Sequence, residues 1–194
     1  MFWPAPAMVV PNEQLMSSHR QPHATSMAER EETDRLLLVI KNGNVHERRS
    51  ASDALAAMGS EATEPLIRAL LAEQNNDVRW YLSRTLAKIG EPAVDDLICV
   101  LIADEDRDTR RYVAAALAAI GEPAIDPLIG LLADDDPELR GYASLAIGRI
   151  GEPAIPKLME LIKTSDGIVN RCAVMTLHKM GEVGPEALAD YLSK

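Results

Sequence analysis

The apolar residues of the chain recur with the period of an amphipathic helix, in segments separated by short polar turns. In the segment 91–104, one helical face holds Ala93, Val94, Leu97, Ile98 and Leu101. In the segment 109–121, the corresponding face holds Val113, Ala116, Leu117 and Ile120. The acidic run 104–108 lies between the two segments. The pattern predicts a pair of helices, A and B, joined by a polar turn.

This helix pair recurs along the chain. The sequence IGEPA stands at 89–93, 120–124 and 150–154, and weaker copies contain Gly59 and Gly181. Successive glycines of the series are 31, 31, 30 and 30 residues apart. A glycine directly after a helix favours the left-handed cap conformation, and a proline is tolerated in the first turn of a helix. We therefore expect IGEPA to end helix B of one repeat and to begin helix A of the next.

The period divides the chain into repeats and two ends. We place five helix pairs at about 30–59, 60–90, 91–121, 122–151 and 152–181. Residues 182–194 are predicted to form one capping helix with Leu188 and Leu192 turned inward, because a repeat array needs a closed end. Residues 1–29 have four prolines and no helical period, which predicts a flexible N-terminal leader. Met16 or Met27 is an alternative start.

The first A helix is apolar nearly all round in the segment 35–40, RLLLVI. An apolar surface of this kind has to be covered. Two coverings stay open: part of residues 1–29, or end-to-end pairing of two copies of the chain.

Aligning the B helices on the glycine that follows each of them gives columns of equivalent residues. The positions four residues before the glycine are all aliphatic and are assigned to the core. The position twelve before it is assigned to the core in the last four repeats, where it holds Val78, Thr109, Leu139 and Val169. The position eleven before it holds Arg48, Arg79, Arg110 and Arg140, with Asn170 in the last repeat. We expect these arginines to tie acidic turns (Asp77, Asp108, Glu138) to the adjacent repeat rather than to bind an anion. The position nine before the glycine holds Tyr81, Tyr112 and Tyr142, predicted to fill grooves between B helices with solvated hydroxyls.

The 30- to 31-residue period, the glycine and proline between repeats, and the sequence DVR at 77–79 resemble the short HEAT-like repeat, which also occurs in phycobilisome lyase subunits. The resemblance covers about residues 30–194. It implies an all-α fold, a right-handed α-solenoid of about five helix pairs and a C-terminal capping helix. It further implies that the A helices form the convex layer and the B helices the concave layer, and it implies very little chemistry.

Composition narrows the classes of function. The chain has 20 Lys and Arg against 30 Asp and Glu, a formal net charge of −10, which disfavours a nucleic-acid partner. No apolar run is long enough to span a membrane, and a cytoplasmic protein is predicted. Cys99 and Cys172 lack zinc-type spacing and are expected to be buried free thiols.

No group of residues predicts catalysis, a metal or a cofactor. The acidic turns 104–108 and 134–138 lack the glycine and the closing glutamate of a calcium loop. Aspartates that precede a helix are expected to cap its N-terminus. We therefore assign no catalytic, metal-binding or cofactor-binding residue.

The outward face of the B helices is the candidate site. It comprises the positions ten, seven, six and three residues before each glycine, which are rich in small residues and hold Asp53 as their only carboxylate. A shallow groove with large apolar points and arginines is typical of an interface. The residues predicted to bind a protein are Arg49, Trp80, Arg84, Arg111, Ala115, Leu145, Arg171, Met175 and His178.

The sequence therefore favours a non-enzymatic scaffold that holds an acidic or amphipathic protein segment in the concave groove of the B helices. The protein is expected to be a monomer or a weak homodimer. The alternative that the resemblance implies is a bilin lyase or isomerase subunit acting on a phycobiliprotein. A third possibility, a DNA-binding HEAT array similar to the alkyl-purine glycosylases, is opposed by the acidic charge.

Overall fold

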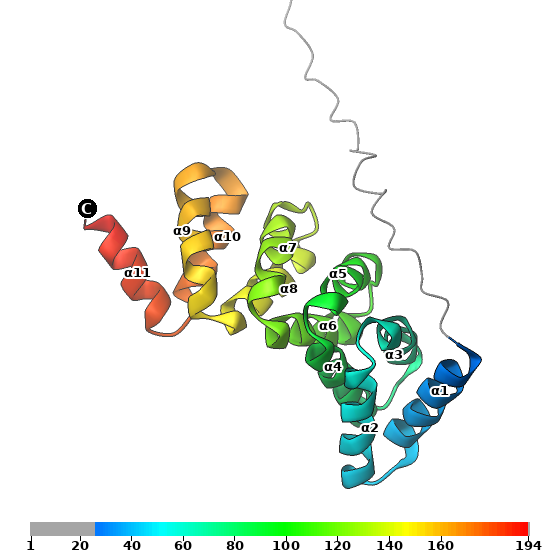
Figure 1. Cartoon of the computed structure of the whole chain (residues 1–194). Coiled ribbons are helices and arrows are strands. Elements are labelled where there is room, and N and C mark those ends of the chain that lie inside the picture. Colours follow the sequence, from blue (N-terminus) through cyan, green and yellow to red (C-terminus); the bar gives the residue numbers. More distant parts are fainter. Residues whose placement is uncertain (1–25, 194) are drawn as a thin grey trace, which may run out of the picture.

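The computed structural model describes residues 26–193, and these form a curved array of helix pairs (Figure 1). In this part of the chain there are eleven α-helices and no strand. The A helices are α1 (Met27–Asn42), α3 (Ser60–Ala72), α5 (Val94–Ala103), α7 (Ile125–Gly130) and α9 (Ile155–Thr164). The B helices are α2 (Val45–Ala57), α4 (Asn76–Ile89), α6 (Arg107–Ile120), α8 (Pro137–Ile150) and α10 (Gly167–His178), and α11 (Val183–Leu192) follows them. The predicted α-solenoid of five helix pairs and a terminal helix is confirmed.

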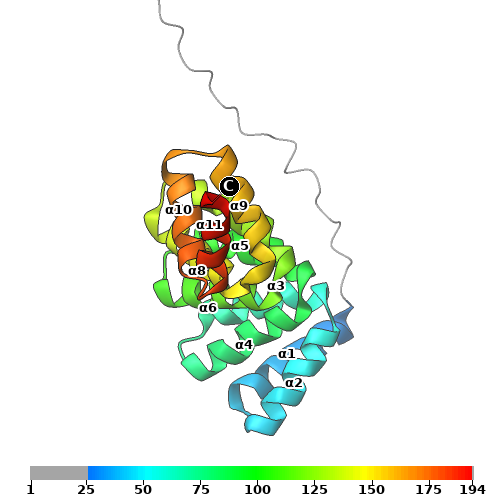
Figure 2. The ribbon, with the colours of Figure 1, turned by 90° about the vertical axis from the view of Figure 1, so that its left-hand side faces the viewer.

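The helices form two layers. Figure 2 shows α4, α6, α8 and α10 along one side of the array, with α3, α5 and α9 along the other. Consecutive B helices pack closely from α2 to α8, whereas consecutive A helices touch one another much less. An array whose B helices lie closer together than its A helices curves toward the B layer. We therefore describe the B layer as the concave one.

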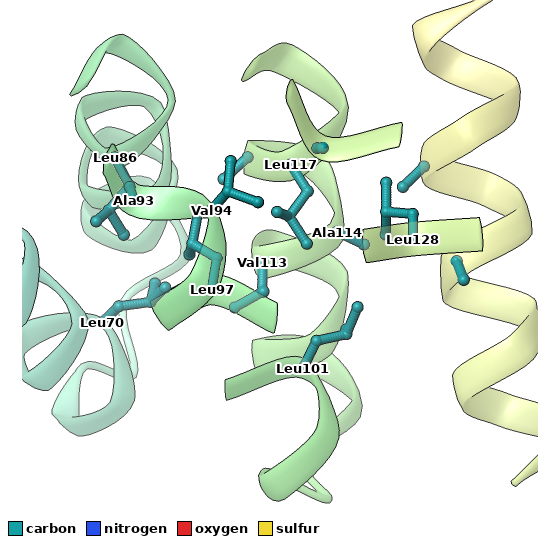
Figure 3. Packing of buried hydrophobic residues seen from close by; sticks show 14 of the residues in the cluster. Leu70, Leu86, Ala93, Val94, Leu97, Leu101, Val113, Ala114, Leu117 and Leu128 are labelled. Atoms are coloured by element: carbon teal, nitrogen blue, oxygen red, sulfur yellow. The ribbon is translucent and has the colours of Figure 1, made fainter. Parts of the chain in front are cut away.

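The core is a continuous ladder of aliphatic side chains between the layers. Each B helix contributes one fully buried residue four places before its glycine: Leu55, Leu86, Leu117, Ile147 and Leu177. Figure 3 shows the central part of this ladder, where Val94 and Leu97 of α5 lie against Val113 and Leu117 of α6. The core assignment made from the periodicity is confirmed at these positions and at Val78, Thr109 and Leu139, whereas Val169 is only half-buried. Burial of this ladder is the main source of stability for the array.

The sequence IGEPA folds as a helix stop and a short 3-10 turn. Glu-Pro-Ala forms η2 (Glu91–Ala93), η3 (Glu122–Ala124) and η5 (Glu152–Ala154), and the A helix begins directly afterwards. Gly121 has φ 86° and ψ −133°, so it is not in the left-handed helical region that we expected. It lies instead in a mirror-image extended region that is almost exclusive to glycine. This conformation turns the chain sharply between the layers.

Several local expectations need correction. Helix α1 begins at Met27 with Ser26 as its N-cap, three residues before the expected boundary at residue 30. The rest of the expected leader, residues 1–25, lies outside the described residues, as does the side chain of Leu192, while Leu188 is half-buried against the core. Cys99 is exposed, because it points away from the face that Leu97 and Leu101 bury.

The fourth A helix is shorter than its equivalents. Helix α7 ends at Gly130, and the chain continues as the 3-10 turn η4 (Leu131–Ala133). Leu131 and Leu132 remain buried in this turn, so the core is continuous although the helix is not.

Candidate protein-interaction face

The arginine column fixes how one repeat sits on the next. Arg110 of α6 is buried, with 6% of its surface exposed. Its Nε donates to the carbonyl oxygen of Asp104 at 2.6 Å, at the end of α5, and its Nη1 donates to Oδ2 of Asp136 at 2.9 Å, in the following repeat. One guanidinium therefore donates to a free backbone carbonyl at the C-terminus of its own A helix and binds the carboxylate that caps the next B helix.

Arg79 repeats this arrangement one repeat earlier. Its Nε donates to the carbonyl oxygen of Glu73 at 2.6 Å, and its Nη1 lies 3.6 Å from Oδ2 of Asp106. The expectation that arginines link adjacent repeats is thus confirmed at Arg79 and Arg110. The nearest carboxylates are however Asp106 and Asp136, two residues before the expected Asp108 and Glu138, although Asp108 also lies 4.0 Å from Arg79.

Asp106 and Asp136 are also the N-caps of α6 and α8. The Asp106 carboxylate accepts from the backbone N–H of Thr109 at 2.9 Å and from its hydroxyl at 2.8 Å. These bonds, together with the charge of Arg79, hold the pKa of Asp106 below its usual range. The backbone N–H of Glu138 and the Arg110 guanidinium lower the pKa of Asp136 in the same way. The acidic turns thus serve as helix caps, as their position predicted.

The column changes at both ends of the array. Arg48 and Arg140 bond only the backbone carbonyls of the turn before their own helix. Asn170 does the same with its amide, which donates to Ile162 at 2.8 Å and to Ser165 at 3.2 Å. In the described part of the column, the ion pair between repeats therefore belongs to Arg79 and Arg110, while Arg48 contacts the next repeat through the ring of Tyr81.

The tyrosine column connects consecutive B helices. The hydroxyl of Tyr112 donates to the carbonyl oxygen of Asn76 at 3.2 Å, and that of Tyr142 donates to Arg107 at 3.2 Å. Each acceptor is the first residue of the preceding B helix. Tyr81 is buried and lies under the guanidinium of Arg48, 5.6 Å from its ring centroid. The rings fill the predicted grooves, but the hydroxyls of Tyr112 and Tyr142 bind backbone instead of being solvated only.

The large apolar side chains predicted for the outward face do reach the surface. Trp80 is 47% exposed, Leu145 51% and Met175 52%. The rings of Trp80 and Tyr81 form a T-shaped pair with centroids 4.9 Å apart, and the Arg84 guanidinium lies over the Trp80 ring, 5.2 Å from its centroid. Three apolar anchors therefore stand along the concave layer, on α4, α8 and α10.

The polar residues of this face are mostly cationic. Arg49, Arg84, Arg111, Arg171 and His178 are all exposed. Asp53, the one carboxylate of the predicted set, pairs with Lys88 of α4, which lowers the pKa of Asp53. Arg111 pairs with Asp108 of its own helix at 3.1 Å. Arg171 forms no ion pair within residues 26–193, so its charge is available to another molecule.

One of the four predicted outward columns is buried in the first three repeats and half-buried in the last two, at Ser144 and Val174. Ser52, Ser83 and Ala114, seven residues before their glycines, are at most 5% exposed. They lie in the seams between consecutive B helices, where the hydroxyls of Ser52 and Thr85 are 2.7 Å apart. Ala115, one position further on, is half-buried. Helical phase alone does not reveal these seams, because they depend on how neighbouring helices approach.

Two hollows open on the C-terminal half of the concave layer. One, of about 340 Å³, lies between α6 and α8 and is lined in part by Tyr142 and Leu145. The other, of about 330 Å³, lies between α8 and α10 and is lined in part by Ile168 and Met175. Gly141 of α8 lines both hollows. A β-carbon at that position would meet no atom within 4 Å, so packing inside the protein does not require glycine there.

The hollow between α8 and α10 is cationic. Arg140, Arg171 and Lys179 line it, and no carboxylate does. Lys179, like Arg171, has no ion-pair partner among the residues that the structure describes. The chain has a net charge of −10, so the positive charge of this hollow is opposite in sign to that of the protein as a whole. Sequence reasoning missed Ile168 and Lys179, whereas Gly141 stood on the predicted outward face without being named as a binding residue.

The described residues contain no group of three His, Cys, Asp or Glu side chains placed to hold a metal ion. None of the helices within 26–193 combines the length and the apolar character that crossing a membrane requires.

Several solved structures are similar to the chain over most of its length, at low identity. The solved structures that resemble the chain include the complex of CpcE and CpcF of phycocyanin lyase from Nostoc sp. PCC7120, with 22% identity, a TM-score of 0.42, and coverage of 75% of this chain and 98% of that one. An engineered protein matches with 20% identity and a TM-score of 0.31, over 82% of this chain and 84% of the other. Computationally designed armadillo repeat proteins for modular peptide recognition match with 21% identity and a TM-score of 0.30, over 82% and 92%. No curated protein matches the sequence.

Family models identify the repeats themselves. A model of the PBS lyase HEAT-like repeat matches residues 47–72. The model of HEAT repeats matches three overlapping stretches, 63–141, 94–177 and 125–193, which together span more than half of the chain. The chain therefore belongs to the HEAT-repeat family.

Proposed function

We propose that the protein is a non-enzymatic scaffold that binds a protein partner on the concave layer of its B helices. The observation that carries the proposal is the pair of hollows on either side of Gly141, with the exposed anchors Leu145 and Met175 at their edges. A shallow apolar groove with a polar rim is typical of protein interfaces. A stacked array is already ordered, so that binding in its groove costs little conformational entropy.

The charge of the groove specifies the kind of segment that fits it. Arg171 and Lys179 are unpaired in the described structure, and the hollow between α8 and α10 has no carboxylate. An acidic segment with one or two large apolar side chains would place its charges near these cations and its apolar side chains near Met175 and Ile168. Electrostatic complementarity of this kind sets orientation and the rate of association.

Glycine at position 141 supports the same proposal. Glycine inside a helix destabilises it by roughly 0.5–1 kcal/mol relative to alanine, and here no neighbouring atom requires it. A close approach by another backbone is one reason for such a residue. Gly141 leaves the surface of α8 open from the hollow beside α6 to the one beside α10.

The experiment is affinity purification of the tagged full chain from its own cells, with mass spectrometry of the bound proteins. We expect Trp80→Ala and Leu145→Glu to reduce capture of a specific partner by about tenfold or more, as loss of a central anchor does. Ile102→Glu is the matched control, since Ile102 is 48% exposed on α5 of the opposite layer.

Charge is tested in the same assay. Arg171→Glu is expected to weaken capture, whereas Arg30→Glu on α1 changes the net charge equally and is expected to leave it unchanged. A partner that is captured equally by Trp80→Ala, Arg111→Glu and Leu145→Glu would contradict binding on this face.

The alternative, a bilin lyase or isomerase subunit, has the support of the repeat match at residues 47–72 alone. Incubation with a bilin and an acceptor phycobiliprotein separates the two functions. Formation of a covalent adduct, with its change in absorbance, would contradict the non-enzymatic scaffold and support a bilin lyase or isomerase.

A further inference from the structure

Helix α1 ends the described array and has an apolar outer side. Leu38 is 60% exposed, which makes it the most exposed leucine for which the structure describes a side chain. Leu37 and Val39 beside it are only partly buried. Every other A helix has a neighbouring A helix on both sides or a terminal helix beyond it, and α1 has α3 on one side only.

Hollows lie on both sides of Leu38. The first, of about 380 Å³, lies between α1, α3 and α4, with Val78 and Leu82 of α4 in its lining. The second, of about 490 Å³, lies beside α1 and the start of α2, and is lined in part by Val39 and Glu47. Leu38 lines both of them. The Leu38 side chain thus projects from α1 between the two hollows.

The stripe of α1 that contains Leu38 has charged residues of opposite sign at its two ends. Asp34, Leu37, Leu38 and Lys41 follow one another at i, i+3, i+4 and i+7, so they form one stripe along α1. The stripe has an acid at one end, a base at the other and leucines between them. When two such stripes run antiparallel, each acid faces a base and the leucines face each other.

We infer that two copies of this chain pair through α1 in an antiparallel arrangement about a two-fold axis. Leu38 of each copy enters a hollow beside α1 of the other. Asp34 of each copy lies near Lys41 of the other. Asp34 makes no ion pair within residues 26–193, and Lys41 reaches Glu73 at 3.6 Å while its side chain remains 62% exposed.

Charge favours a second copy over the apolar N-terminal stretch 1–10 as the occupant. The most apolar stretch before α1, residues 1–10, contains no charged side chain. It could fill an apolar hollow but would leave Asp34 without an opposite charge, and would add none for the exposed Lys41 beyond Glu73. The inference is independent of the proposed function, since α1 belongs to the A layer and the concave face stays free.

The test is sedimentation of the full chain over a wide range of concentrations. We expect a reversible monomer–dimer equilibrium. Leu38→Lys and Asp34→Lys should each weaken it by about tenfold or more, because the first removes the central apolar contact and the second opposes like charges. Ile102→Lys is the control for a similarly exposed residue on α5. Circular dichroism checks that each variant is folded.

Charge exchange gives the decisive comparison. Asp34→Lys combined with Lys41→Asp in one chain should restore the dimer, because each pair is again opposite in sign. A full chain that stays monomeric, or a dimer that Leu38→Lys leaves intact, overturns the inference. A photoreactive amino acid at position 38 that crosslinks within one chain to residues 1–25 would assign the hollow to those residues and overturn it as well.

Discussion

At the scale of single residues, one arginine in each of the second and third repeats, Arg79 and Arg110, does two structural tasks. Arg110 bonds the end of its own A helix through Nε and the next B helix through Nη1. Lysine could not replace it, because a single ammonium lacks the forked geometry of the guanidinium. The column that resembled an anion-binding stripe is therefore internal structure, and the cations available for binding are others, such as Arg171.

Arg110→Gln is expected to destabilise the fold by about 2–4 kcal/mol, because it leaves buried polar groups without their charged partner. Arg107→Gln is the matched control on the same helix. Arg107 also reaches into the next repeat, to Glu138, but its side chain is 77% exposed, and such pairs contribute at most about 1 kcal/mol. Urea unfolding of both variants measures the difference. Equal unfolding midpoints would show that Arg110 does not hold the repeats together.

At the scale of elements, the repeated IGEPA sequence sets the angle between the layers. Gly90, Gly121 and Gly151 share nearly the same backbone angles, with φ between 80° and 86°. No neighbouring atom lies within 4 Å of a β-carbon built at any of them. The requirement for glycine therefore comes from the backbone conformation alone.

Gly121→Ala is expected to cost about 1–3 kcal/mol, because alanine strongly disfavours this conformation. Gly130→Ala is the control: Gly130 has a helical φ of −54° and equally open space, so alanine should be neutral or stabilising by up to about 1 kcal/mol. Thermal unfolding followed by circular dichroism gives both values. If both variants lose stability equally, the positive φ of Gly121 would not be the reason for glycine at that position.

At the scale of the whole molecule, the two ends of the array differ. Helix α11 packs on α10 at the C-terminal end, whereas α1 leaves Leu38 exposed at the other end. The contact of α11 depends on a close approach at Gly184. A β-carbon there would lie 1.9 Å from the carbonyl oxygen of Leu177.

Gly184→Ala is accordingly expected to displace α11 from α10 while leaving the central repeats folded, since each repeat depends mainly on its neighbours. Hydrogen exchange should accelerate in α10 and α11 and stay unchanged in α4–α6. Gly148→Ala, in open space on α8, is the control. Uniform loss of protection along the array would indicate that the chain unfolds as one cooperative unit.

Much of the candidate face could be predicted from the sequence. The buried leucines fix the phase of each B helix, and this phase places Trp80, Leu145 and Met175 outward, where the structure has them. The same phase wrongly placed Ser52 and Ser83 on the surface. Their burial depends on the approach of a neighbouring helix, which no single helix encodes.

The sequence by itself determined the repeat, its length, the two-layer solenoid and the core. These follow from local periodicity and from glycine and proline, whose conformational limits act within a few residues. Only the tertiary structure decided which carboxylates the arginines hold and where the hollows beside Gly141 and Leu38 open. Such features join residues about 30 positions apart, and their geometry depends on the distance and angle between packed helices, which side-chain volumes across the seams set together.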